Sequence, residues 1–184
     1  MTPRIETDRL VLTPMTIADL DHYLELHSDP DVARFLGPMD RELATTRLES
    51  DACVWGERGH GLFKVCDRDD GRFLGRAGLR YWPQFDETEV GWTLRREEWG
   101  NGFATEAAAA CTDWGFRNLS VPYLTSCIAP ENARSIAVAE RLGMTPLRHD
   151  VLDGIPVVGG QILNGIEVVI YAITREDWAL RRAA

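Results

Sequence analysis

The spacing of apolar positions along the chain predicts a series of short strands and amphipathic helices. Apolar runs bounded by turn residues are typical of strands. We expect strands at residues 9–13, 62–66, 73–81, 89–94, 123–129, 145–152 and 167–174. Apolar positions three and four residues apart are typical of helices. We expect helices at residues 16–27, 41–57, 104–118 and 132–142.

Local capping signals agree with these helices. Thr16 and Asp19 match a capping box, Asp40 is suited to begin the second helix, and Gly143 can end the fourth in a left-handed conformation. The links between the second, third and fourth strands are short, which favours an antiparallel meander. We therefore expect one domain over residues 1–184 with an α+β fold. Its central sheet would be mixed but mostly antiparallel, with about seven strands flanked by about four helices.

The composition narrows the class of protein. A length of 184 residues and 45% hydrophobic content suit a single core. No long apolar run or leader-like N-terminus is present, so we expect a cytoplasmic protein without a membrane segment. The net charge of −9, without a basic stripe, argues against nucleic-acid binding. The cysteines show no metal-ligand spacing, so we expect no metal and treat them as core residues: Cys53, Cys66, Cys111 and Cys127.

The segment from Glu89 to Ala110 carries the strongest functional signal. A predicted strand runs into the glycines Gly100 and Gly102, and a long helix follows. Glycines admit positive φ and let an anion approach the main chain, while the first N–H groups of a helix lack intrahelical partners. We expect a pyrophosphate site here. The alternative is a strand-to-helix connection that merely needs a flexible backbone.

The motifs around this segment resemble a known family. WGNGFATEA, preceded by EVGWTLRREE and followed by ENARSIAVAERLGM, is similar to the GNAT acetyltransferases, in particular the RimJ/RimL-like branch of protein N-terminal acetyltransferases. The opening IETDRLVLTPMTIADLDHYLELHSDPDVARFLG also matches, so the resemblance covers nearly the whole chain. It implies the GNAT fold, with acetyl-CoA as co-substrate.

The resemblance also implies which residues bind acetyl-CoA. The family's Q/R-x-x-G-x-G/A loop falls on Glu97, Gly100 and Gly102, and Glu97 departs from the pattern because it is acidic. The implied contacts are Trp92, Thr93, Leu94, Glu97, Gly100, Asn101, Gly102, Phe103, Ala104, Thr105, Asn132 and Ser135. Four arginines could add contacts to the nucleotide phosphates, or could be ordinary surface residues: Arg95, Arg96, Arg134 and Arg141.

Glu89 and Ser135 are the candidate catalytic residues. Glu89 lies about 17 Å upstream of Leu94 along a strand, roughly the reach of a pantetheine arm. By resemblance, the arm follows this strand and a main-chain N–H near Trp92 stabilises the oxyanion. We expect Glu89 to act as general base, through water, although a strand-end glutamate can equally be a solvated carboxylate. Ser135 would donate to the leaving sulfur; alternatively, Asn132 and Ser135 simply form a helix start.

The chemistry of the acceptor favours a protein or peptide N-terminus. A peptide α-amine, with a pKa of about 7.7–8.0, is far more often neutral at pH 7 than lysine, with about 10.4, so a weak base suffices. The four histidines, His22, His27, His60 and His149, form no triad that we can defend. Two alternatives stay open: a small-molecule amine acceptor, such as a metabolite or antibiotic, and a CoA-binding module without turnover. The chain could be a monomer or a homodimer, and residues 150–161 could form a lip over the acceptor or a passive loop.

Overall fold

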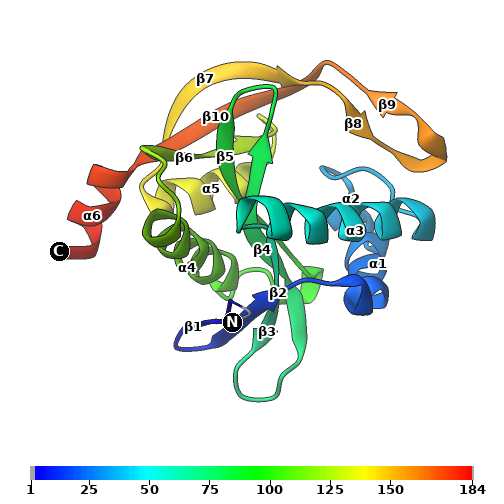
Figure 1. Ribbon diagram of the computed structural model, residues 1–184, viewed down its shortest axis with the longest axis horizontal. Coiled ribbons are helices and arrows are strands. Elements are labelled where there is room, and N and C mark those ends of the chain that lie inside the picture. Colours follow the sequence, from blue (N-terminus) through cyan, green and yellow to red (C-terminus); the bar gives the residue numbers. More distant parts are fainter. Residues whose placement is uncertain (1–2, 184) are drawn as a thin grey trace.

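Eight strands form the central sheet of the computed structural model, which describes residues 3–183 (Figure 1). The strands are β1 (Ile5–Glu6), β2 (Leu10–Pro14), β3 (Leu62–Asp67), β4 (Phe73–Trp82), β5 (Glu87–Leu94), β6 (Tyr123–Ile128), β7 (Thr145–Leu152) and β10 (Ile166–Thr174). Their order is β1-β2-β3-β4-β5-β6-β10-β7. Every neighbouring pair is antiparallel except β5 and β6, which are parallel.

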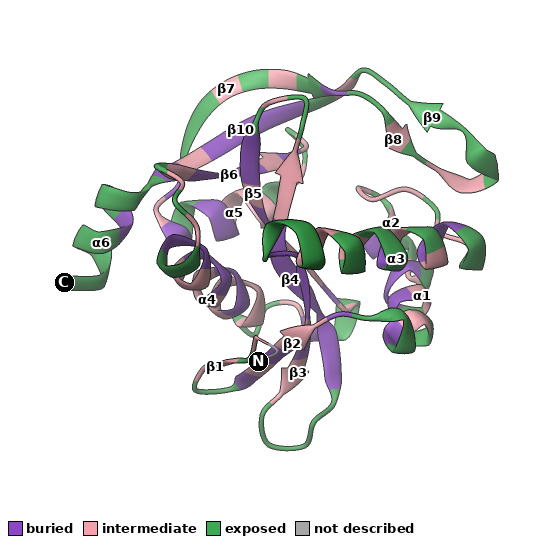
Figure 2. Cartoon of the chain, in the orientation of Figure 1, coloured by how far each residue is buried: buried purple, intermediate pink, exposed green. Residues whose placement is uncertain are grey.

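Helices cover both faces of this sheet. They are α1 (Leu20–Ser28), α2 (Pro30–Ala33), α3 (Arg41–Arg58), α4 (Phe103–Asn118), α5 (Ala133–Leu142) and α6 (Arg175–Ala183), with short 3₁₀ turns η1 (Ile17–Asp19), η2 (Arg96–Glu98) and η3 (Val158–Gly160). Helix α1, with α3 packed against it, contacts one face, and α4 contacts the other (Figure 1). Burial is concentrated along β4 and β5, whereas the outer side of α3 is exposed (Figure 2).

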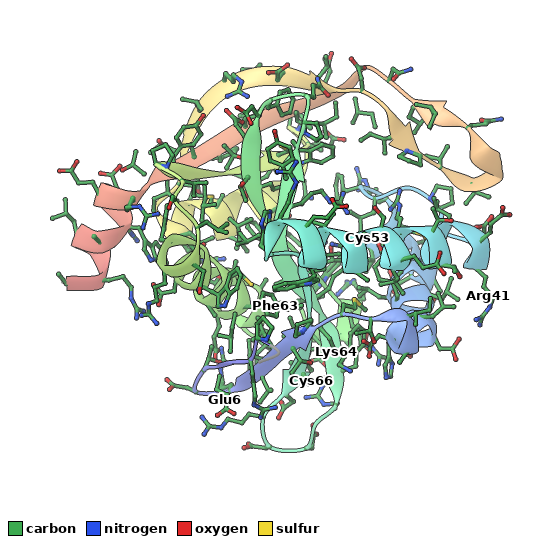
Figure 3. All side chains as sticks on the ribbon, viewed as in Figure 1. Glu6, Arg41, Cys53, Phe63, Lys64 and Cys66 are labelled. Atoms are coloured by element: carbon green, nitrogen blue, oxygen red, sulfur yellow. The ribbon has the colours of Figure 1, made fainter. Side chains whose placement is uncertain are left out.

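Strand β3 shows how alternation separates the two faces. The Phe63 ring packs edge-on against Trp55 of α3 and Trp114 of α4, in the larger of two main apolar cores. The next residue, Lys64, points the other way, and its Nζ lies 2.5 Å from Asp19 Oδ1 before α1 (Figure 3). The second core lies under α1, α2 and α3. Two packed layers therefore hold the central strands from both sides.

The structure confirms the α+β class and the mixed, mostly antiparallel sheet. The cap predictions hold as well: the main-chain N–H of Thr16 donates to Asp19 Oδ2 (2.9 Å), Asp40 Oδ1 accepts from the N–H of Leu43 (2.8 Å), and Gly143 has φ 85°. The predicted strands and helices recur with small shifts of their ends. Among residues 3–183, the structure adds β1, α2 and α6, which the apolar spacing alone did not indicate.

Two local expectations need correction. Residues 150–161 are not a plain loop, because β7 continues to Leu152 and the segment then forms β8 (Ile155–Pro156), which pairs with β9 (Ile162–Leu163). The cysteines are not all core residues: Cys111 is buried, Cys66 and Cys127 are half-buried, and Cys53 is exposed on α3 (Figure 3). Among residues 3–183, no helix combines the length and apolar character needed to cross a membrane.

Candidate active site

Strands β5 and β6 pair at one position and then separate. Glu89 and Thr125 are the only registered partners of this parallel pair within residues 3–183. Beyond that point, hydrogen bonds that involve side chains take the place of main-chain pairing between the two strands. Ser126 Oγ donates to the carbonyl oxygen of Val90 (2.5 Å), and the main-chain N–H of Cys127 donates to Glu89 Oε1 (3.1 Å). The edge of β5 from Gly91 to Leu94 therefore has no strand beside it among the described residues.

The main chain of Trp92 points toward this open edge. The carbonyl oxygen of Val90 accepts from Ser126, and that of Leu94 accepts from the indole N–H of Trp99 (2.9 Å), so both face away from β4. Main-chain groups alternate along an antiparallel strand, and the β4–β5 register is regular throughout. The N–H and C=O of Trp92, midway between those two carbonyls, consequently face the same way.

The carboxylate of Glu89 stands at the point where the strands part. Its Oε2 accepts from Trp82 Nε1 (2.5 Å) and its Oε1 from the N–H of Cys127. Burial raises the pKa of Glu89 above its ordinary value, while these two hydrogen bonds and the guanidinium of Arg80 oppose the rise. A carboxylate with a raised pKa is a stronger base, which suits proton transfer near neutral pH.

The predicted pyrophosphate loop has the conformation that its glycines allow. Gly100 and Gly102 adopt φ 84° and 81°, and Gly102 is the residue before α4. The first hydrogen bond of α4 runs from the N–H of Glu106 to the carbonyl of Gly102 (3.1 Å), which leaves the preceding N–H groups available at the helix start. Arg9, just before β2, supports the loop, because it donates to the carbonyl of Asn101 (2.9 Å) and pairs with Glu106.

The two arginines before the loop form ion pairs with acidic side chains. Arg95 Nε lies 2.7 Å from Glu97, so the acidic residue at the first motif position is paired within its own turn. Arg95 also contacts Glu25 (2.6 Å), and Arg96 Nε contacts Asp31 (3.0 Å). As free phosphate ligands, Arg95 and Arg96 are weaker candidates than their sequence position suggested.

Trp99 brings the start of α5 next to the loop. The guanidinium carbons of Arg96 and Arg134 lie 4.8 and 4.5 Å from the centre of its ring. Cation–π contacts of this kind are worth about 0.5–2 kcal/mol. Arg134 thus lies beside the loop, whereas Arg141, seven residues later, lies near the far end of α5 and offers its carbonyl to Arg181.

Asn132 is the N-cap of α5. Its Oδ1 accepts from the main-chain N–H of Ser135 (3.2 Å), as the helix-start interpretation of this pair requires. The amide NH₂ of Asn132 and the hydroxyl of Ser135 are still available for a ligand. Both residues are partly exposed, so the cap geometry and a contact with a cofactor are compatible.

Sequence reasoning missed a group of polar residues from α1, α3 and β4, two of which, Arg76 and Arg80, influence the pKa of Glu89. Arg80 is the cross-strand partner of Glu89, and Arg76 lies four residues earlier on the same face of β4. Alternation along the predicted strand at residues 73–81 could have revealed these two arginines. Nothing local in the sequence marks His27 or Asp51 as their neighbours, because both come from distant helices.

Comparisons with known proteins identify the family. The model of the acetyltransferase (GNAT) domain matches residues 9–145. The YkkB protein of Bacillus subtilis (strain 168), which is uncharacterised, is 35% identical over 77% of this chain and 84% of its own. The crystal structure of an acetyltransferase from Agrobacterium tumefaciens str. C58 has a TM-score of 0.78 and 31% identity over 95% of this chain and 96% of that one.

The fold also recurs in a ribosomal-protein acetyltransferase. RimL, named as a ribosomal L7/L12 α-N-protein acetyltransferase, has a TM-score of 0.74 at 15% identity, over 95% of both chains. This similarity confirms the fold. The domain match, which spans residues 9–145, goes further and shows that the chain belongs to the GNAT family of acetyl-CoA-dependent N-acetyltransferases.

Proposed function

We propose that this acetyltransferase acts on the N-terminal amine of a protein or peptide, with Glu89 as general base. The observation that carries the proposal is the position of Glu89, at the one paired position before β5 and β6 separate. A base there stands at the inner end of an open strand edge. Two hydrogen bonds hold it in place, and its raised pKa suits proton abstraction.

The residues along the open edge of β5, where it separates from β6, suit the binding of acetyl-CoA. The amide groups at the start of α4 can donate to a pyrophosphate, and the carbonyl oxygen of Trp92 can accept from an amide N–H of an extended arm. Phe103, Ala104 and Thr105 form the first turn of α4, and Asn132 with Ser135 begins α5. Acetyl-CoA supplies an activated thioester, and the chain supplies donors at both ends of an extended ligand.

Each catalytic residue then has a defined task. The neutral amine attacks the acyl carbon, and Glu89, directly or through water, accepts the proton that the nitrogen gives up as this bond forms and the thiolate of CoA leaves. The N–H of Trp92 faces the edge on which an oxyanion donor is needed. Ser135 can donate to the departing sulfur, but its share should be small, because a thiolate of pKa about 8.5 leaves near neutral pH with little protonation.

A peptide N-terminus is the acceptor that the chemistry favours. About a tenth of α-amines are neutral at pH 7, so a single carboxylate suffices as base, whereas lysine needs a stronger one. The fold shared with RimL, named as an α-N-protein acetyltransferase, supports the same acceptor class. Small-molecule amines remain the second candidate for this fold.

The test is thiol release from acetyl-CoA over three acceptor panels: peptides with free N-termini, N-blocked lysine peptides, and small amines that include polyamines and aminoglycosides. We expect turnover with the first panel and a loss of about 10²- to 10⁴-fold for Glu89→Gln. Glu167→Gln, which alters an exposed glutamate of β10, is the matched control. Preference for the small amines would support the second candidate, and CoA binding without thiol release would support a non-catalytic module.

A further inference from the structure

A group of polar side chains lies beside Glu89, between α1, α3 and β4. We call it the acceptor-side cluster. Its members are Tyr23, His27, Arg47, Asp51, Arg76 and Arg80. Charges within the cluster act on the ionisation of His27, Asp51 and Arg76, and Arg76 and Arg80 also act on that of Glu89.

The sheet register fixes where this cluster lies relative to the candidate base. Arg80 and Glu89 are directly opposite each other on β4 and β5. Opposite side chains on one face have Cβ atoms about 4.5–5.5 Å apart. Arg76 lies on the same face, and Arg47 and Asp51, four residues apart, share one side of α3. The cluster therefore extends from the candidate base into the layer beneath the helices.

Its inner members are deeply buried and lack partners. The exposed fractions of Tyr23, His27 and Arg76 are 0%, 4% and 8%. Within residues 3–183, no hydrogen-bond partner exists for Tyr23 Oη, either ring nitrogen of His27, Asp51 Oδ2 or Arg76 Nε. A buried polar group without a partner costs about 1–3 kcal/mol, and more when it is charged.

The arginines of the cluster differ from many others in the chain. Arg148 contacts Glu87 and Asp150, and Arg72 contacts Asp67, Asp70 and Glu98. Arg47, Arg76 and Arg80, in contrast, have no carboxylate oxygen within 4.0 Å in the described part of the chain. This lack of pairing occurs in a protein of net charge −9, where acidic side chains are abundant.

The cluster thus has the composition of an anion site. A buried guanidinium is stabilised by a hydrogen-bonded anion, and its planar fork fits a carboxylate. Asp51 is the one carboxylate among the three arginines, and it does not touch them. Burial raises its pKa, which lowers the negative charge that it can offer.

Resting on the proposed function, we propose that the acceptor-side cluster selects peptide N-termini that carry an acidic side chain close to the reacting amine. Glu89 receives the amine, and Arg80, directly opposite, receives the carboxylate with Arg76 and Arg47 behind it. An Asp or Glu at the second or third position of the peptide carries its carboxylate close to the amine.

The β8–β9 hairpin lies on the same side of the molecule as the cluster. Arg47 Nη2 donates to the carbonyl oxygen of Pro156 in β8 (2.8 Å), so one member of the cluster connects α3 to the hairpin. Figure 1 shows the hairpin extending over α2 and α3.

The test compares kcat/KM for paired peptides that differ only by Asp or Asn at position 2, or Glu or Gln at position 3. We expect wild-type protein to prefer the acidic member of each pair by at least about tenfold, the scale of one charge-assisted hydrogen bond. The preference should shrink to within about threefold in Arg80→Gln and in Arg47→Gln. Arg117→Gln removes an equal charge from an exposed site on α4 and should keep the preference.

A binding measurement separates this inference from the proposed function. Calorimetry with the N-acetylated forms of the same peptides reports the acidic-side-chain contact without any turnover. Charge-selective binding that Arg80→Gln removes, without acetylation of any peptide, would support the inference and contradict the proposed reaction. Acetylation of the peptides without charge preference would support the proposed reaction and contradict the inference. Stronger competition by free aspartate or glutamate than by the peptides would also overturn the inference, since the site would then serve amino acids.

Discussion

The indole N–H of Trp82 donates to Glu89 Oε2 at 2.5 Å, from the next strand of the sheet. The main-chain N–H of Cys127, on the opposite side, donates to the other oxygen. Glu89 is therefore held between two strands rather than extended into solvent. A solvated strand-end carboxylate would not be held by two such donors, which supports a defined role for this residue.

Removal of the Trp82 hydrogen bond should move the acidic limb of the pH–rate profile. Glu89 acts as a base only when deprotonated, so activity falls as pH drops through its pKa. The Trp82 indole lowers that pKa, so Trp82→Phe should shift the limb toward higher pH. The measurement is kcat/KM for one peptide from pH 5 to 9. In the Glu89→Gln background the same substitution should leave the profile unmoved, and a lower rate without a shift would indicate a packing role alone.

Alanine at Gly102 should weaken both folding and acetyl-CoA binding. Gly102 has φ 81°, and an added Cβ would lie 3.4 Å from Arg9 Nη2. The left-handed conformation costs a non-glycine residue about 1–2 kcal/mol. We expect a corresponding fall in unfolding free energy and a higher KM for acetyl-CoA. Gly56→Ala, in the open interior of α3, should stabilise slightly. An unchanged KM for Gly102→Ala would argue against the loop as the pyrophosphate site.

Asn132→Asp separates the two roles of that residue. Aspartate caps a helix about as well as asparagine, so the acceptor for the Ser135 N–H is retained and the melting temperature should stay within a few degrees. The amide donor is lost, however, and a negative charge replaces it. We expect KM for acetyl-CoA to rise severalfold. If KM is unaffected while Asn132→Ala destabilises the protein, the residue is a cap and nothing more.

His27 should make folding sensitive to acid. Burial, followed by the nearby charges of Arg76 and Arg47, lowers its pKa to about 3 from 6.5. The folded protein therefore keeps His27 neutral, while the unfolded chain takes up a proton below pH 6.5. Stability from this group is fully present above pH 6.5 and is lost as pH falls toward 3, at about 1.4 kcal/mol per pH unit.

Urea unfolding at pH 7 and pH 5 checks this expectation. The loss attributable to His27 between these values should be about 2 kcal/mol, because most of it accumulates below pH 6.5. His27→Gln should remove that part of the pH dependence, whereas His149→Gln, on an exposed position of β7, should retain it. Equal slopes for His27→Gln and wild type would show that the ring is protonated in the folded state.

The sequence predicted the helices and strands better than the contacts between them. Helix ends followed from Asp40 and Gly143, whose capping chemistry is local. The position of Glu89 on its strand followed from alternation, but its two donors did not, because Trp82 lies across a turn and Cys127 on a strand 38 residues away. Long-range pairing of this kind is set by the whole sheet, and the local pattern of a single sequence does not show it.

Short elements were missed for a related reason. Strand β1 has two residues and α2 has four, too few for an apolar repeat to be recognised. The ion pairs of Arg95 and Arg96 with Glu25 and Asp31 were also hidden, since the partners come from α1 and the start of α2. Charge counted along the sequence says little about which charges remain free after folding.

The sheet is held together least well between β5 and β6, which share a single paired position. Strands β1 to β5 form one continuous antiparallel ribbon, while β6, β10 and β7 form another, and the two meet at Glu89 and Thr125. A ligand that lies along the open edge of β5 would supply the hydrogen bonds that are missing between β5 and β6. The free energy of unfolding would then rise with the fraction of protein that holds acetyl-CoA, so the concentration of the acetyl donor would govern the lifetime of the folded protein as well as its rate of turnover.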